Sequence, residues 1–182
     1  MTTALVLVDI QNDYFSGGNM ALEGMDAAAA NAARLLAGFR ERGLPVFHVR
    51  HLSVRPGATF FVPGTPGADL HVSVNPAAGE PVVEKNFPNS FRSTRLLEQL
   101  RGANADGVVI AGAMSHMCID ATTRAGFDHG LRCTVAEDAC ATRALEFGGR
   151  TIPARDVHAA FMAALAVPYA RIAPTEDVLR SL

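Results

Sequence analysis

The stretch ALVLVDI, residues 4–10, is a continuous apolar run that ends in an acidic residue. Its length and its β-branched residues predict a strand that is buried on both faces. An alanine- and leucine-rich segment at helical spacing follows over residues 26–42, with Asp26 as the expected N-cap and Gly43 as the expected stop. The next apolar run, PVFHVR at residues 45–50, predicts a second strand. This order of strand, helix and strand is typical of a parallel βαβ unit.

The same alternation continues to the C-terminus. Further strands are expected at 81–84, 107–111, 131–136 and 169–173, and helices at 94–100, 117–129, 154–167 and, capped by Thr175, at 175–182. A loop rich in proline and glycine, residues 51–79, is long enough to be a binding loop. The pattern predicts one α/β domain over residues 1–182, a three-layer αβα arrangement of Rossmann-like topology whose mainly parallel sheet has helices on both faces.

Composition narrows the class of protein. The 182 residues are 49% hydrophobic and 19% charged, as in globular proteins. The net charge of −2 provides no basic field for phosphates, so we expect no nucleic-acid partner. No run approaches the ~20 apolar residues of a membrane span, and no signal peptide is evident, so a soluble, cytoplasmic protein is expected. The odd count of three cysteines argues against a disulfide framework.

Three polar residues come at or just after predicted strands: Asp9, Lys85 and Cys118. Because the carboxyl ends of parallel strands meet at one edge of a sheet, we expect them to converge in one crevice. Helix N-terminal amides and Lys85 would then lower the pKa of the Cys118 thiol, and Asp9 would take its proton and return it to a leaving amine. Each residue also has a purely structural alternative: Cys118 as a core side chain, Asp9 as a cap of the turn after the first strand, and Lys85 as a surface lysine.

The remaining cysteines and histidines point to no cofactor. Cys133 and Cys140 form no C-x-x-C pair, and we expect both to be buried, unreactive thiols. His48 and His51 are three residues apart on a predicted strand, so they face opposite sides and are poorly placed to share an ion. His71 lies far along the loop. No metal ion and no other cofactor is expected.

Aromatic residues near the predicted crevice are candidate pocket walls. The expected walls and contacts are Phe15, Phe60, Phe61 and Phe87, with Asn89 and His116 as further contacts to a substrate. For the three loop phenylalanines, an oligomer interface is an equally good alternative.

Three segments resemble the isochorismatase-like cysteine hydrolases: ALVLVDIQNDYF, VVEKNFPNSF and VIAGAMSHMCIDATTRAGFDHG. The resemblance covers nearly the whole chain, and the three segments occur in family order and at family spacing. The resemblance implies a six-stranded, mainly parallel sheet flanked by helices, and a catalytic triad of Asp9, Lys85 and Cys118. It also implies a cis peptide bond between Ala113 and Met114, with the N–H groups of Met114 and Cys118 forming an oxyanion hole.

The resemblance also implies a reaction. Such hydrolases form a thioester on the cysteine, release ammonia or an amine, and hydrolyse the thioester with water. The expected partner is a small-molecule amide or cyclic amide, and the expected assembly is a homo-oligomer, a dimer or a tetramer.

Departures from the family pattern refine the expectation. Nicotinamidases carry an Asp-x-His…His metal site after the second strand, and residues 47–52 lack that aspartate, which favours a metal-free amidohydrolase branch. Streptothricin-type hydrolases resemble this branch. True isochorismatases lack the cysteine, so Cys118 argues against cleavage of a vinyl ether. The alternatives are a nicotinamidase-like metal-assisted amidase, a non-catalytic or ligand-sensing member of the fold, and a thiol redox protein that uses Cys118.

Overall fold

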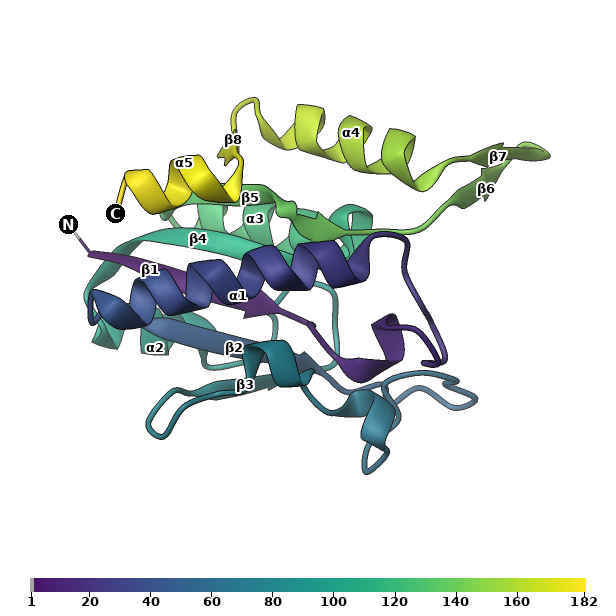
Figure 1. The fold of residues 1–182 in the computed structure, drawn as a ribbon, viewed down its shortest axis with the longest axis horizontal. Coiled ribbons are helices and arrows are strands. Elements are labelled where there is room, and N and C mark those ends of the chain that lie inside the picture. The colour runs from purple at the N-terminus through teal and green to yellow at the C-terminus, as the bar shows by residue number, and fades with distance from the viewer. Residues whose placement is uncertain (1) are drawn as a thin grey trace.

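The computed structural model describes residues 2–182 and contains a six-stranded parallel sheet in the order β3-β2-β1-β4-β5-β8 (Figure 1). The strands are β1 (Thr2–Val8), β2 (Val46–His51), β3 (Val82–Lys85), β4 (Ala105–Ala113), β5 (Arg132–Ala141) and β8 (Ala170–Ala173). Every neighbouring pair in this sheet is parallel. The predicted fold class is therefore confirmed.

The apolar run that opens the chain is buried because β1 is covered on both faces. Successive side chains of a strand point to opposite faces. Leu5 and Leu7 enter one core cluster, and Ala4, Val6 and Val8 enter the other. A strand between two cores needs apolar residues at consecutive positions, which explains why this segment does not alternate with polar residues.

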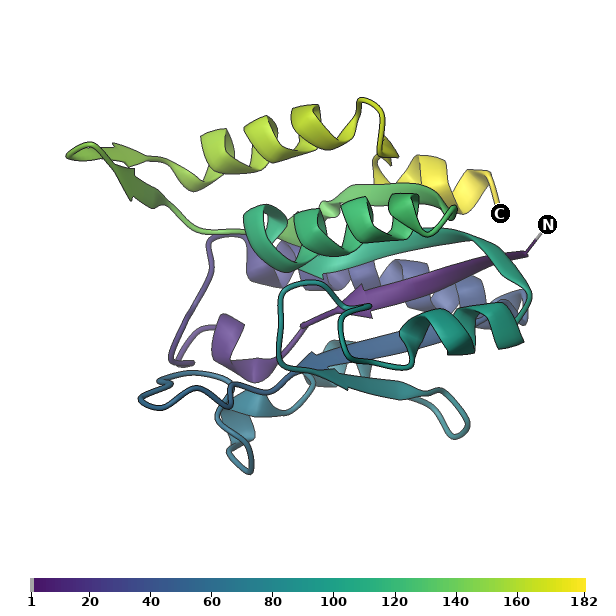
Figure 2. The same cartoon turned by 180° about the vertical axis from the view of Figure 1, so that it is seen from behind.

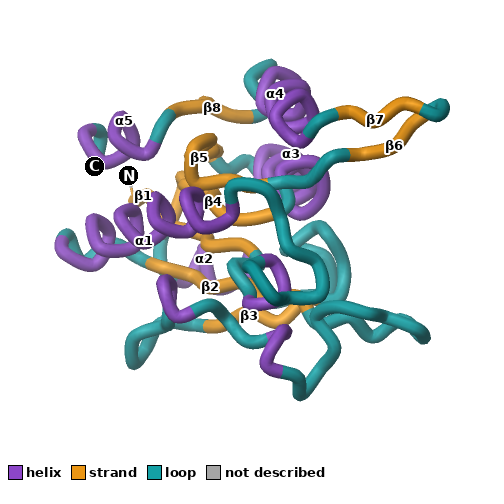
Figure 3. The backbone as a smooth tube through the Cα atoms, turned by 45° about the vertical axis from the view of Figure 1, so that its right-hand side comes forward, coloured by secondary structure: helices purple, strands orange, loops and turns teal. Residues whose placement is uncertain are grey.

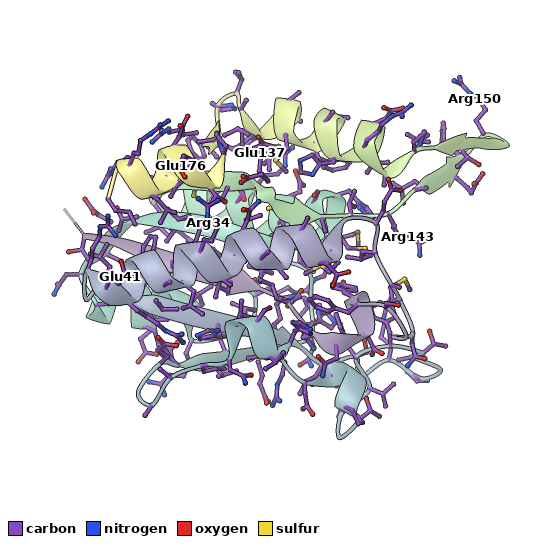
Figure 4. All side chains as sticks on the ribbon, in the orientation of Figure 1. Arg34, Glu41, Glu137, Arg143, Arg150 and Glu176 are labelled. Atoms are coloured by element: carbon purple, nitrogen blue, oxygen red, sulfur yellow. The ribbon has the colours of Figure 1, made fainter. Side chains whose placement is uncertain are left out.

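Helices cover the two faces of the sheet. They are α1 (Met25–Glu41), α2 (Leu96–Gly102), α3 (Asp120–Asp128), α4 (Ala154–Leu165) and α5 (Thr175–Arg180). Helices α1 and α5 lie on the face toward the viewer in Figure 1, and α2 and α3 lie on the face shown in Figure 2. Arg34 of α1 and Glu176 of α5 form an ion pair of 2.7 Å that joins the two helices (Figure 4). No helix among residues 2–182 has the length and apolar character needed to cross a membrane.

The helix ends differ in part from the expectation. Helix α1 begins after Gly24, whose φ of +74° is left-handed, so Asp26 lies in the first turn and its prediction as the N-cap is wrong. Gly43, with φ of +62°, follows this helix as a stop. Thr175 does not act as a cap either: its N–H and its Oγ1 both donate to Asp138 Oδ1, each over 2.7 Å. The carboxylate that holds the start of α5 therefore comes from β5.

Strand β5 and the segment after it were only partly predicted. The strand continues to Ala141, with its pairing to β4 interrupted between Ile110 and Gly112. A hairpin of β6 (Leu145–Phe147) and β7 (Arg150–Ile152) then extends away from the sheet (Figure 3). The loop between β2 and β3 contains two short helical turns, Pro66–Ala68 and Val72–Val74, and a third lies at Asn12–Tyr14.

Candidate active site

The three predicted site residues converge at the carboxyl edge of the sheet. Asp9 follows β1 directly, Lys85 is the last residue of β3, and Cys118 lies in the turn after β4. Asp9 has a left-handed φ of +54°, a conformation that aspartate tolerates better than most residues. All three residues are buried: the solvent-exposed fraction is 0% for Asp9, 1% for Lys85 and 6% for Cys118.

Lys85 is the centre of this cluster. Its Nζ donates to Asp9 Oδ2 over 2.7 Å, to Cys118 Sγ over 3.2 Å and to a ring nitrogen of His51 over 3.0 Å. An ammonium group has three N–H donors and no acceptor, so these three partners use all of its hydrogens. The nitrogen of His51 that faces Lys85 is Nδ1, which must accept, and the hydrogen of the neutral ring is therefore on Nε2.

Burial and charge set the protonation states at rest. Burial alone would lower the pKa of Lys85, but the charge of Asp9 and the hydrogen bonds to Asp9 and Cys118 raise it, so the amine stays protonated. Burial raises the pKa of the Cys118 thiol, and the charge of Asp9 raises it further, against the opposing effect of Lys85. The expectation that this pKa is lowered is wrong, because the desolvation of a buried thiol outweighs the nearby cation.

Asp9 is placed to receive the thiol proton. Its Oδ2 is bound to Lys85, whereas its Oδ1 is buried and makes no hydrogen bond within residues 2–182. A carboxylate oxygen of Asp9 and Cys118 Sγ lie within 4.8 Å of each other. A buried acceptor without a donor is costly, and a nearby S–H group is a donor that relieves the cost. A proton that passes from sulfur to carboxylate stays within the buried cluster, so the net charge of the cluster is unchanged. The ammonium contacts both groups, so negative charge on either one lies beside a cation.

The same cluster resembles a metal site in its spacing only. One donor atom each from Asp9, His51 and Cys118 lie within 4.8 Å of one another, and these are residue types that bind zinc. All three residues, however, accept hydrogen bonds from Lys85, whose ammonium occupies the position between them. These side chains therefore do not fit a resident metal ion.

A tight backbone turn carries the cysteine. Gly112 has φ of +129°, and a Cβ at this position would lie 1.9 Å from the carbonyl oxygen of Val8. The peptide bond between Ala113 and Met114 is cis, where the resemblance implies one. Residues Ser115–Ile119 then form a single π-helical turn that contains Cys118 and leads into α3. The regular helix thus begins after the cysteine, at residue 120, and not at residue 117.

A cavity of about 380 Å³ opens beside Cys118. Three of the phenylalanines that were expected in a pocket, Phe60, Phe61 and Phe87, line it. The other lining residues are Tyr14, His51, Ser53, Val54, Arg55, Asn86, Pro88, Met114, Met117 and Cys118. Most of the wall is aromatic or apolar, which is typical of a site for a small organic molecule.

Three further expected contacts lie elsewhere. The ring of Phe15 stacks on His71, with ring centroids 3.6 Å apart. Asn89 Oδ1 accepts a hydrogen bond of 2.8 Å from a backbone N–H two residues along the chain. His116 Nδ1 is bound to Thr142 Oγ1 over 2.6 Å. Each side chain is thus occupied by a structural partner, and none of the three residues lines the cavity.

Two buried polar residues outside the predicted site, Gln11 and Asp13, position the cavity wall. Gln11 donates from Nε2 to the carbonyl oxygens of His51 and Ala68, over 2.9 and 2.8 Å, and its Oε1 accepts from the His51 N–H over 2.7 Å. Asp13 Oδ2 accepts from the N–H of Phe61 over 2.6 Å. The sequence contains an indication of this role, since both residues belong to the polar run that follows the first strand.

Cys133, Cys140 and His48 make no hydrogen bond with the cluster of Asp9, Lys85 and Cys118. Burial raises the pKa of Cys133 and of Cys140 to about 12, in keeping with the expectation of unreactive thiols. His48 is bound through Nε2 to Glu80 Oε2 over 2.8 Å, whereas His51 contacts Lys85. The two strand histidines thus have separate partners.

A pH dependence of stability follows from His51. Burial, together with the charge of Lys85, lowers the pKa of His51 from 6.5 to about 4. As the pH falls below 6.5 the unfolded chain takes up this proton, but the folded protein resists it until about pH 4. The free energy of unfolding should therefore decrease across this window as the pH is lowered, with no further loss from this residue below it.

The substitution His51→Asn tests this contribution. Asparagine keeps an oxygen acceptor for Lys85 but does not titrate. In urea unfolding at several pH values across the window, the variant should lose less stability than the wild type. The exposed His129 provides a matched control, His129→Asn, which should follow the wild type. Equal losses in the wild type and in His51→Asn would contradict this assignment.

Comparisons with known proteins find relatives that match nearly the whole chain. Residues 3–176 match the isochorismatase domain family. The isochorismatase family protein YddQ of Bacillus subtilis is 50% identical over 180 residues, which cover 99% of this chain and 100% of that protein. A solved structure of this family from Oleispira antarctica has a TM-score of 0.95 and 53% identity, and the match covers 98% of this chain and 96% of that one.

Two more distant relatives have named activities. Maleamate amidohydrolase of Pseudomonas putida is 32% identical over 154 residues, which cover 77% of this chain and 72% of that enzyme. Streptothricin hydrolase of Streptomyces noursei is 36% identical over 140 residues, which cover 76% of this chain but only 49% of that enzyme.

Proposed function

Because this chain belongs to the isochorismatase family of hydrolases, we propose that it cleaves a carbon–nitrogen bond of a small amide through a thioester on Cys118. The observation that carries the proposal is the buried ammonium of Lys85, which contacts both Asp9 and Cys118 beside an apolar cavity. Maleamate amidohydrolase and streptothricin hydrolase support the choice of an amide substrate.

The first half of the reaction forms the thioester. Asp9 takes the proton of the thiol as Cys118 Sγ attacks the amide carbon and the carbonyl oxygen becomes negative. The backbone N–H groups of Met114 and Cys118 are the donors proposed for this oxyanion. Asp9 then returns the proton to the amine, the carbon–nitrogen bond breaks, and the acyl group remains on sulfur.

The second half consumes one water molecule. Asp9 takes a proton from water as the water oxygen attacks the thioester, and the same proton returns to Cys118 Sγ when the carbon–sulfur bond breaks. The products are a carboxylic acid and the free thiol. Throughout both halves Lys85 stays protonated beside Asp9 and Cys118, so negative charge on either group costs less in this buried site.

The raised pKa of Cys118 also bears on the redox alternative. Oxidation of a cysteine by peroxide proceeds through the thiolate and needs an exposed sulfur. The residue is only 6% exposed and its thiol stays protonated at rest, which argues against a sensor role. A thiol that loses its proton only during attack on a bound amide suits a hydrolase.

Intact-protein mass spectrometry during turnover tests the proposal. With a panel of small primary amides, the wild type should release ammonia and gain the mass of one acyl group, which peptide mapping should place on Cys118. The variant Cys133→Ala removes another buried thiol and should form the same adduct. Ammonia release without an adduct after rapid acid quenching, or an adduct on a different residue, would count against the thioester. If no amide in the panel releases ammonia, the proposed function fails.

A further inference from the structure

Arg55 is the charged residue of the cavity wall. Among the described residues that line the cavity, it is the only one whose side chain carries a full charge at neutral pH. His51 is neutral because its pKa is lowered to about 4, and Cys118 is a protonated thiol. No aspartate or glutamate lines the cavity to oppose the guanidinium.

The guanidinium of Arg55 is available to a ligand. Arg50, near the end of β2, is paired with Glu84 and lies 3.8 Å from Asp69, whereas no ion pair or side-chain hydrogen bond within residues 2–182 occupies Arg55. Arg55 and His51 line the same cavity, and the charge of Arg55 makes a small contribution to the lowered pKa of His51 after burial and Lys85. Arg55 is itself exposed, so its guanidinium is a solvent-accessible cation on the wall of a mostly apolar cavity. An arginine without a partner in such a position is suited to a planar anion such as a carboxylate.

The other walls restrict the body of the ligand. Phe61 packs edge-on against Tyr14 and Phe60, with ring centroids 4.6 and 5.1 Å apart, and these rings form one aromatic surface. Flat apolar groups pack well against such a surface. His51 also lines the cavity, and because its Nδ1 accepts from Lys85, the hydrogen of its neutral ring is on Nε2. The guanidinium and the rings together favour a small molecule with a flat apolar body and an anionic group.

We propose that Arg55 makes this site selective for amides whose acyl part carries a carboxylate, that is, for monoamides of dicarboxylic acids with a short, flat body. The inference rests on the proposed function for the reaction but not for the binding. In the bound state the guanidinium donates to the carboxylate while the amide carbon lies against Cys118. A neutral amide of the same shape would leave the guanidinium without a partner.

Kinetics on matched pairs of amides tests the selectivity. The pairs are 3-carbamoylbenzoate with benzamide, and succinamate with butyramide. The wild type should prefer the carboxylate member of at least one pair by roughly 10- to 100-fold in kcat/KM, because one charge-assisted hydrogen bond stabilises a complex by about that factor. Arg55→Gln should lose this preference through a higher KM, with neutral amides changed by less than about threefold. Arg55→Lys should keep part of it, and Arg101→Gln, an exposed arginine on α2, should keep all of it.

Binding to the unreactive variant Cys118→Ala provides a readout that does not need catalysis. By calorimetry, isophthalate should bind more tightly than isophthalamide, and adding Arg55→Gln should abolish the difference. Equal binding of the two ligands, or a preference that survives Arg55→Gln, would overturn the proposal. If isophthalate binds as expected but no amide is hydrolysed by the wild type, the proposed function fails and the anion selectivity stands.

Discussion

Replacing Cys118 by alanine should lower kcat/KM for amide hydrolysis by about 10⁴-fold or more, since removal of a covalent nucleophile leaves only binding and oxyanion stabilisation. Cys118→Ser should lose a comparable factor, although a hydroxyl can still accept the hydrogen bond from Lys85. Both variants should remain folded, because Cys118→Ala removes one buried atom and Cys118→Ser replaces that atom by an oxygen. The measurement is ammonia release under single-turnover and steady-state conditions.

The controls separate chemistry from packing. Cys133→Ala removes a buried sulfur from β5 and should keep the wild-type rate within a few-fold. Circular dichroism and urea unfolding should show that both Cys118 variants are native. If either variant kept more than about a tenth of wild-type activity, the sulfur could not be the attacking atom.

Replacing Lys85 by methionine should destabilise the protein by about 3–5 kcal/mol at pH 7, since removal of one partner of a buried ion pair leaves an uncompensated charge. Asp9 and Lys85 both have side chains with no solvent exposure and are joined over 2.7 Å. Activity should also be lost, because the thiolate formed during attack no longer has a cation beside it. Urea unfolding measures the first effect and ammonia release the second.

A double variant distinguishes the two effects. Asp9→Asn combined with Lys85→Met removes both charges and should recover much of the stability, but none of the activity. As a surface comparison, Arg95→Met breaks the exposed pair of Arg95 and Glu98 and should leave the stability close to that of the wild type, because solvent screens this pair. A stable, fully active Lys85→Met variant would refute the role given to this residue.

Much of the site could be predicted because it lies at strand ends. Asp9, Lys85 and Cys118 each come at or after an apolar run, and a parallel sheet brings such positions to one edge. The direction of the pKa shift at Cys118 could not be predicted in this way. It depends on how completely distant segments exclude water from the sulfur, and a local pattern of charges contains no information on that exclusion.

The cavity wall and the hairpin show a different limit. The path of the loop after β2 is set by hydrogen bonds from Gln11 and Asp13, so the arrival of Arg55 beside His51 depends on residues some forty positions away. The strands of the hairpin have only three residues each, too few for an alternating pattern to be recognised. Gly148 and Gly149 were the available signal, since both have positive φ and two such glycines favour a tight hairpin turn.

The ammonium of Lys85 gives this site a property that a bound ion would not. A cation that is part of the polypeptide needs no loading step, cannot be exchanged for a competing ion and does not depend on its concentration in the surroundings. The central positive charge is encoded in the sequence, and it is placed when β3, which ends at Lys85, joins the sheet. Folding and assembly of the charged centre are therefore a single event.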